Sequence, residues 1–354
     1  MSTRINHAVL HVFDFNSCVN VFSEEELDLS SRQVKNYVST HARRALSNID
    51  NKHGSFSEGS MFAERLRAYR DGALGFIDLS VEAAQFLCSQ LEHQDKAASA
   101  DLLAIDFEED AEIEAGTERQ DLVDEAFDGR TPRYFALLLL ESKQAYMHEV
   151  GRADNGAVRN AIARHYAILP NPSQKVASYA VVDLRSMSVV FCDKPRSISG
   201  EERLIIPDGL LQCSSEASSK EVIDTVTRIV EEVADEYGAN SAVALSKAKA
   251  RVSEAADEEE YLAPWDMAAD VFEDEPLQKR FEEAVAEERL PERIPVEKKV
   301  AQRVAKNHKI RTDTGIEITF PSEYSNSSEF IEFVNAPNGL IRIELKNIGS
   351  IENR

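Results

Sequence analysis

The sequence predicts an α+β fold: a mixed or antiparallel sheet in an N-terminal domain, and a mainly helical C-terminal half closed by a small β unit. Strand-like segments of the first 200 residues follow one another as candidate hairpins, without the regular strand–helix alternation of a doubly wound sheet. Helical spacing of apolar residues dominates from about residue 220 onward. Strict alternation of apolar and polar residues returns only near the C-terminus.

Length and composition favour two globular domains. The chain has 354 residues, of which 43% are hydrophobic and 29% are charged. We place the boundary within the loop-like segment from Lys194 to Ser219, which gives an α+β domain over 1–200 and a helical region over 201–354. No apolar run reaches the about 18 residues of a transmembrane helix, and the N-terminus lacks a signal-peptide pattern. We therefore expect a cytoplasmic protein with no membrane contact.

The first elements follow from local periodicity. The β-branched residues Ile5, Val9 and Val12 predict a strand over 4–13. Apolar residues three and four positions apart then predict helices over about 31–48, 60–70 and 80–98. The apolar run at 102–107 predicts a second strand.

An acidic segment follows this second strand. Residues Asp101 to Asp128 include twelve acids and one base, Arg119. We interpret 108–128 as an exposed loop, because a run of acids favours contact with solvent. The oxygen-ligand spacing of a calcium-binding EF-hand loop is absent from it. A partner-binding or DNA-mimicking surface is the alternative for the same charges.

The middle of the chain predicts two hairpins. The first joins 133–140 to 145–150, and the second joins 179–184 to 188–192 through a turn at Arg185-Ser186. Between them, 158–168 is expected to be a short polar helix or an irregular segment that ends before Pro170.

The C-terminal half begins with an amphipathic helix over 222–237 that Gly238 ends. Further apolar spacings predict helices over 241–257, around 277–285 and over 296–306. Alternation over Gly315–Phe320, and again over Leu340–Leu345 after an Asn338-Gly339 turn, predicts the small closing antiparallel sheet.

Known catalytic and metal-binding motifs are missing from the sequence. It has no phosphate-binding loop, no G-x-S-x-G and no H-E-x-x-H. His7 and His11 lie about 13 Å apart in the expected strand, too far to share a metal ion. The four cysteines form no C-x-x-C pair, so we expect reduced, mostly buried thiols. We predict no enzyme, metal or cofactor; a nuclease stays the alternative that would require acids clustered around a metal.

A basic segment stands out because the net charge is −23, which disfavours nonspecific binding to nucleic acid. Between Arg293 and Arg311 there are seven Lys or Arg and a single acid, and the spacing of Lys299, Arg303 and Lys306 predicts a shared helical face. The candidate DNA-binding residues are Lys298, Lys299, Arg303, Lys306, Lys309 and Arg311. No recognition-helix motif is evident, so contacts would be with phosphates. The alternative is that these cations form an ordinary solvent-exposed helix face with no ligand.

The C-terminal segment also carries a family resemblance. K-N-H-K-I-R-T-D-T-G-I-E-I-T-F-P at 306–321, F-I-E-F-V-N at 330–335 and P-N-G-L-I-R-I-E-L-K-N-I at 337–348 resemble the closing signature of the bacterial nucleoid-associated protein family, NdpA/YejK type. N-H-A-V-L-H near the start and L-L-A-I-D-F at 102–107 look similar too. The resemblance implies a cytoplasmic, non-enzymatic protein of the nucleoid that organises the chromosome, binds double-stranded DNA and forms a homodimer. It carries over no catalytic residues, and the DNA contacts above rest on local charge alone.

The acidic stretches leave a second functional reading open. The acids at 108–128 and at 254–275 would suit an acidic interaction or regulatory protein that binds a DNA-handling partner, for instance in phage defence. Such a protein would have little DNA affinity of its own.

Overall fold

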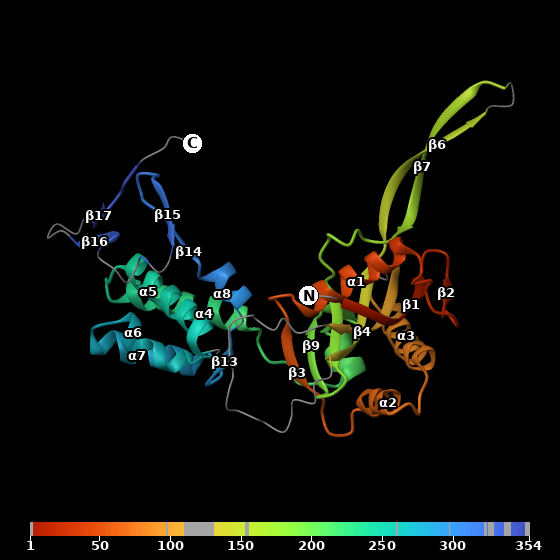
Figure 1. Cartoon of the computed structure of the whole chain (residues 1–354), viewed down its shortest axis with the longest axis horizontal. Coiled ribbons are helices and arrows are strands. Elements are labelled where there is room, and N and C mark those ends of the chain that lie inside the picture. The colour runs from red at the N-terminus through yellow and green to blue at the C-terminus, as the bar shows by residue number, and fades with distance from the viewer. Residues whose placement is uncertain are drawn as a thin grey trace. The chain divides into compact units, whose positions relative to one another are not determined.

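The computed structural model describes residues 3–96, 98–109, 131–152, 156–259, 261–296, 298–321, 324, 329–335 and 341–350. Contacts group the chain into two compact units, Met1–Glu216 and Ala217–Arg354, whose elements are drawn in Figure 1. Most of the expected acidic loop over 108–128 and the Asn338-Gly339 turn lie outside the described residues. The division into independent domains at 1–200 and 201–354 stays a prediction.

A seven-stranded antiparallel sheet forms the centre of the first unit. Its strands are β1 (Thr3–Asp14), β2 (Val19–Val21), β3 (Lys52–Ser55), β4 (Ala100–Glu109), β5 (Arg133–Glu141), β8 (Ser178–Asp183) and β9 (Ser188–Cys192). They are ordered β2-β1-β4-β5-β8-β9-β3. The α+β fold is thus confirmed, as are the expected first strand and the β8–β9 hairpin.

Helices cover both faces of this sheet. Ala104 of β4 packs with buried residues of α2 (Met61–Arg70), α3 (Phe76–Glu92) and the π-helix η1 (Ile205–Leu211). Its neighbour Leu103 packs with buried residues of α1 (Arg32–Leu46) on the opposite face. Strands with two covered faces lack polar alternation, which explains the continuous apolar run of β4. The expected helices over 31–48 and 60–70 are confirmed, whereas the third begins and ends earlier than 80–98.

The first predicted hairpin is wrong. β5 pairs with β4 on one side and with β8 on the other, so both of its edges are occupied. The next strand, β6 (Lys143–Arg152), pairs instead with β7 (Val158–Ile168). Residues 158–168 therefore form a strand and not the expected polar helix or irregular segment. Both faces of this pair are mostly exposed, so no hydrophobic period indicated a strand in the sequence.

The segment expected to be a loop, Lys194 to Ser219, is largely ordered. It contains the paired strands β10 (Arg196–Ile198) and β11 (Glu201–Arg203), followed by η1. Ile206 and Leu211 are fully buried in the core of the first unit. The apolar residues of η1 therefore belong to the α+β unit and do not form a linker to the second unit.

The second unit is mainly helical, as predicted. Its elements are α4 (Ser219–Glu236), α5 (Ser241–Glu254), the π-helix η2 (Ala255–Glu259), β12 (Tyr261–Leu262), η3 (Pro264–Asp266), α6 (Met267–Val271), α7 (Glu275–Glu287), β13 (Ile294–Pro295) and α8 (Lys298–Val304). Gly238 follows α4 with a φ of 68°, a conformation that glycine adopts without strain. Within the described ranges, no helix is both long enough and apolar enough to cross a bilayer.

Two hairpin-like pairs close this unit in place of the single sheet expected. β14 (Asn307–Arg311) pairs with β15 (Glu317–Pro321), and β16 (Ile331–Asn335) pairs with β17 (Ile341–Leu345). The rings of Phe320 and Phe333 lie 6.3 Å apart, so the two pairs pack through aromatic side chains.

Candidate nucleic-acid interface

The short helix α8 presents half of the predicted cations. Val300 and Ala301 are buried and hold the helix against the rest of the second unit. The side chains of Lys298, Lys299 and Arg303 are exposed. Among the residues that the structure describes, none forms an ion pair with Lys299 or Arg303. These two cations are therefore available to an external anion.

The shared helical face predicted for Lys299, Arg303 and Lys306 is only partly correct. α8 ends at Val304, two residues earlier than the expected helix. Asn307 already pairs with Pro321 at the start of β14, so the chain must leave the helical conformation before that point. Lys306 is exposed in the turn between the two elements and not on the helix itself.

The remaining two predicted cations lie on β14 beside an acid. The Lys309 ammonium is 2.8 Å from the Glu317 carboxylate, and Arg311 is the cross-strand neighbour of the same Glu317. Both side chains of the Lys309–Glu317 ion pair are exposed to water, so this pair is weak. The net charge of this face is nevertheless lower than that of α8, which makes α8 the stronger candidate for phosphate contact.

Sequence reasoning missed a second group of exposed cations on the β6–β7 pair. Lys143, Arg152, Arg159 and Arg164 are all exposed there. The available signal was compositional: residues 143–168 hold four Lys or Arg and two acids in a chain of net charge −23. The incorrect prediction of a polar helix over 158–168 hid the fact that these cations share one pair of strands.

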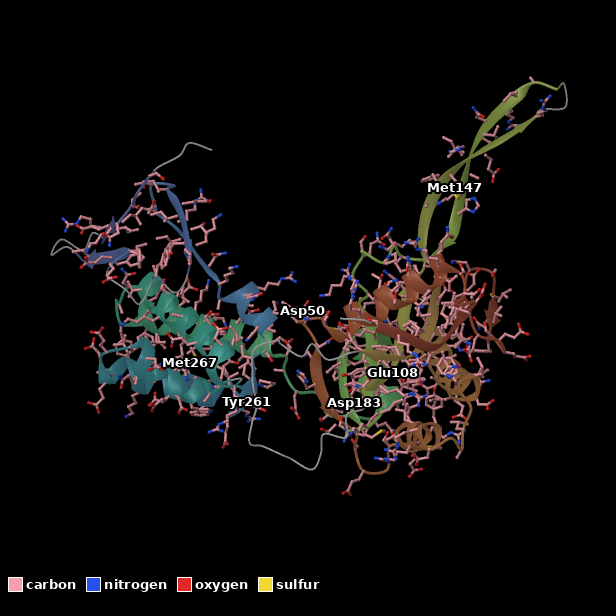
Figure 2. The ribbon with its side chains drawn as sticks, in the orientation of Figure 1. Asp50, Glu108, Met147, Asp183, Tyr261 and Met267 are labelled. Carbon is pink, nitrogen blue, oxygen red and sulfur yellow. The ribbon has the colours of Figure 1, made fainter. Side chains whose placement is uncertain are left out.

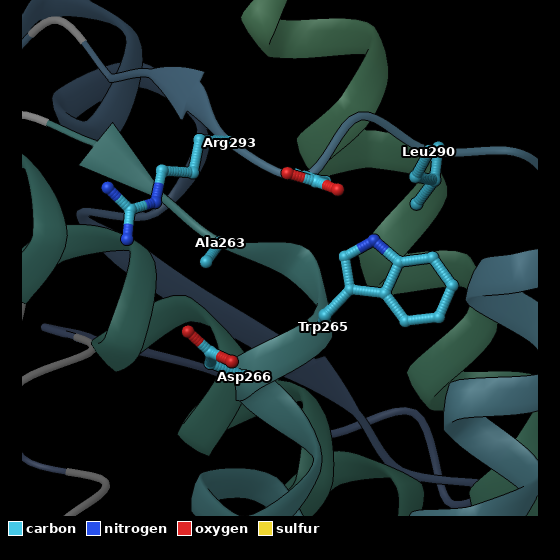
Figure 3. Close-up of a pocket in the computed structure, with 6 residues that line it drawn as sticks. Ala263, Trp265, Asp266, Leu290 and Arg293 are labelled. Atoms are coloured by element: carbon cyan, nitrogen blue, oxygen red, sulfur yellow. The ribbon is translucent and has the colours of Figure 1, made fainter.

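The second unit also contains a pocket of about 530 Å³. It is lined by Ala263, Trp265, Asp266, Leu290, Glu292 and Arg293, and Figure 3 shows Arg293 on one side and the indole of Trp265 on the other. Two carboxylates in the lining oppose the single guanidinium. The pocket is therefore a poor site for a phosphate.

The histidines of β1 form local contacts. His7 Nδ1 lies 2.9 Å from a Glu26 carboxylate oxygen, and the His7 ring stacks on Phe76. His11 is fully buried, and its burial lowers the pKa to about 4, so the ring is neutral near pH 7. No group of three or more His, Cys, Asp or Glu is placed to hold a metal ion in the described part of the chain.

The cysteines match the expected thiols only in part. None of the four forms a disulfide. Cys88 and Cys213 are buried, and burial raises the pKa of each thiol to about 11. Cys18, in contrast, is exposed in the turn that follows β1, so the expectation of mostly buried thiols is too broad.

Comparison with known proteins identifies a family. The sequence model of a family described as nucleoid-associated protein YejK matches residues 9–352, and so extends over both compact units. No curated protein matches the chain.

Proposed function

This chain belongs to the nucleoid-associated protein YejK family, and from that premise we propose that it binds double-stranded DNA in the nucleoid of the cytoplasm. Binding is mostly independent of sequence and directed at the phosphate backbone. The role is chromosome organisation without catalysis, and the protein acts as a homodimer. Two copies of one cationic surface on a single duplex strengthen binding because the second contact is intramolecular.

The observation that carries this proposal is the pair of exposed cations on α8, Lys299 and Arg303, which no described carboxylate neutralises. Lys298 and Lys306 are exposed beside them. Each cation that meets a phosphate releases counterions from the duplex, so affinity falls as salt rises. With a net charge of −23, most of the surface repels DNA and a local cationic group has to supply the contact.

The test is a titration of duplex DNA at two salt concentrations. Four phosphate contacts in a dimer predict that affinity falls on the order of a hundredfold between about 50 mM and about 200 mM salt. The double variant Lys299→Glu with Arg303→Glu should bind DNA more weakly than the unaltered protein at each salt concentration. Its affinity should also depend less on salt. Absent or salt-independent binding by the unaltered protein would contradict the proposal.

A matched control has the same change of charge at another place. Arg32 and Lys35 are exposed in the first turn of α1, where glutamate is compatible with the helix dipole. The double variant Arg32→Glu with Lys35→Glu should retain nearly full DNA affinity. An equal loss in both double variants would show that total charge, and not α8, governs binding.

The acidic surface favours a second candidate function. α7 exposes Glu282, Glu283 and Glu287, which suit a basic partner that handles DNA. In that case the isolated protein binds little DNA, and high salt releases a captured protein partner. The same titration, repeated with and without that partner, separates the two functions.

A further inference from the structure

The β6–β7 pair forms a ribbon that extends from the first unit, well beyond the helices that cover the sheet (Figure 1). Its strands pair from Ala145 opposite His165 to Arg152 opposite Val158. Side chains such as that of Met147 stand out from it into open space (Figure 2). A two-stranded ribbon has little stability of its own in water, so an element of this kind suits binding to a partner.

The two faces of the ribbon differ in chemistry. Cross-strand neighbours share a face, so the pairing places eight residues together. These are Tyr146, His148, Val150, Arg152, Val158, Asn160, Ile162 and Arg164. We call this set the apolar face, because Tyr146, Val150, Val158 and Ile162 are 71%, 69%, 71% and 81% exposed. Large apolar side chains gathered at such exposure indicate an interaction surface.

The charges on the apolar face indicate an anionic partner. It carries Arg152 and Arg164 but no carboxylate, and the Arg164 guanidinium lies 5.9 Å from the centre of the Tyr146 ring. Glu149 belongs to the opposite face, where it lies 3.9 Å from His165. In a chain of net charge −23, a face with cations and no acids is unusual. Pairing two copies of this face with each other would bring the arginines of the two copies together.

We propose that the apolar face of the ribbon inserts into the minor groove of duplex DNA. Arginine and asparagine side chains suit that groove, and apolar side chains can wedge between base steps and bend the duplex. On β6 the apolar face runs from Tyr146 to Arg152 and spans roughly 20 Å, a little more than half of one turn of B-DNA at about 34–36 Å. The inference rests on the proposed DNA binding. It adds a second protein surface that contacts the DNA, the groove that this surface enters and a bend in the duplex.

The experiment measures affinity and bending on a duplex of about 30 base pairs with a fluorophore at each end. One variant combines Val150→Asn with Ile162→Asn on the apolar face. Its control combines Met147→Asn with Ala163→Asn, a directly paired couple on the opposite face. The first should bind about tenfold more weakly and leave the duplex straight, and the control should match the unaltered protein.

Further measurements secure the result. Arg152→Glu changes an exposed side chain and should also weaken binding, and circular dichroism checks that each variant is folded. A dye that occupies the minor groove should displace the protein. DNA that contains glucosylated 5-hydroxymethylcytosine, whose sugars fill the major groove, should be bound as well as unmodified DNA.

The outcomes separate this inference from the proposed function. If the unaltered protein does not bind DNA, both are refuted. If the α8 variant loses affinity but the apolar-face variant binds and bends DNA normally, the inference alone is refuted. It is also refuted if the apolar-face variant turns a dimer into a monomer with unchanged DNA affinity per protomer, because a second copy then occupies the face.

Discussion

Asp106 shows how one residue of the sheet determines its surroundings. Its carboxylate is completely buried and accepts hydrogen bonds from Arg133 Nε at 3.0 Å, from Asn6 Nδ2 at 2.9 Å and from the Tyr69 hydroxyl. Burial and the neighbouring Asp106 raise the pKa of Tyr69 above its usual range, so the phenol keeps its proton. All these partners come from different elements, and the network fixes their arrangement.

Replacing Asp106 alone should lower the free energy of unfolding more than replacing Asp106 and Arg133 together. Asp106→Leu leaves the half-exposed Arg133 without its buried counter-ion and the Tyr69 hydroxyl without its acceptor, and should destabilise the first unit by about 1–3 kcal/mol in urea unfolding. Adding Arg133→Met should recover part of that loss. If the double variant is less stable than Asp106→Leu alone, the interpretation of an uncompensated charge is wrong.

His11 should make stability depend on pH. The Ser23 N–H donates to His11 Nδ1 at 3.0 Å, so the proton lies on Nε2, which is 3.1 Å from Ser80 Oγ. The folded pKa is about 4 against an ordinary 6.5, so acidification through that window protonates the unfolded chain first and stability falls. His41 has the same lowered pKa of about 4. Burial, and then the charge of Asp14, raise the pKa of Asp101 to about 6. This carboxyl therefore opposes the effect of the histidines, because it favours the folded state as the pH falls.

The variant His11→Asn should reduce this dependence. Between about pH 7 and about pH 5, its free energy of unfolding should fall by about 1–2 kcal/mol less than that of the unaltered protein. Chemical denaturation followed by circular dichroism measures the difference. The control is His7→Gln, which changes a half-exposed histidine on the same strand. Identical pH profiles for all three proteins would exclude His11 as the cause.

At the scale of single elements, α4 has the most complete local signals. Ser218 accepts a hydrogen bond from the Glu221 N–H at 3.1 Å, and the Glu221 carboxylate accepts one from the Ser218 N–H at 2.9 Å. This reciprocal capping box satisfies two donors that the helix itself leaves unpaired. One face then buries Val222, Val226 and Val233.

Loss of this cap should weaken the second unit. Ser218→Ala should cost about 1 kcal/mol of unfolding free energy, because a buried helix end loses its acceptor. Trp265, the single tryptophan of the chain, lies in the second unit and reports its unfolding by fluorescence. Glu221→Gln keeps the capping geometry and should cost less. An equal cost for the two substitutions would argue against the capping box.

At the scale of the whole molecule, the boundary of the first unit can be tested with fragments. A fragment over 1–216 keeps η1, whose Ile206 and Leu211 are fully buried, whereas a fragment over 1–200 removes them. Losing several buried apolar side chains costs about 2–5 kcal/mol each. The longer fragment should therefore unfold cooperatively on heating, and the shorter one should not. Equal melting of both would show that η1 is dispensable.

Much of the fold could be predicted because its signals are local. The period of α4, the β-branched residues of β1 and the turn between β8 and β9 are each visible within a few residues, and all three elements are confirmed. The candidate site was predicted less well. Charge counting found Lys299 and Arg303, but only the pairing of Asn307 with Pro321 shows that Lys306 lies outside the helix.

The sequence alone determined the α+β class, the helical second half and the membership of its family, since composition, periodicity and short signatures survive without three-dimensional context. Apart from the β8–β9 hairpin, only the tertiary structure decided which strands of the first unit pair. β5 takes β4 and β8 as neighbours, and β6 therefore forms the separate ribbon with β7. Strand partners lie far apart along the chain and both ribbon faces meet solvent, so no local pattern records the choice.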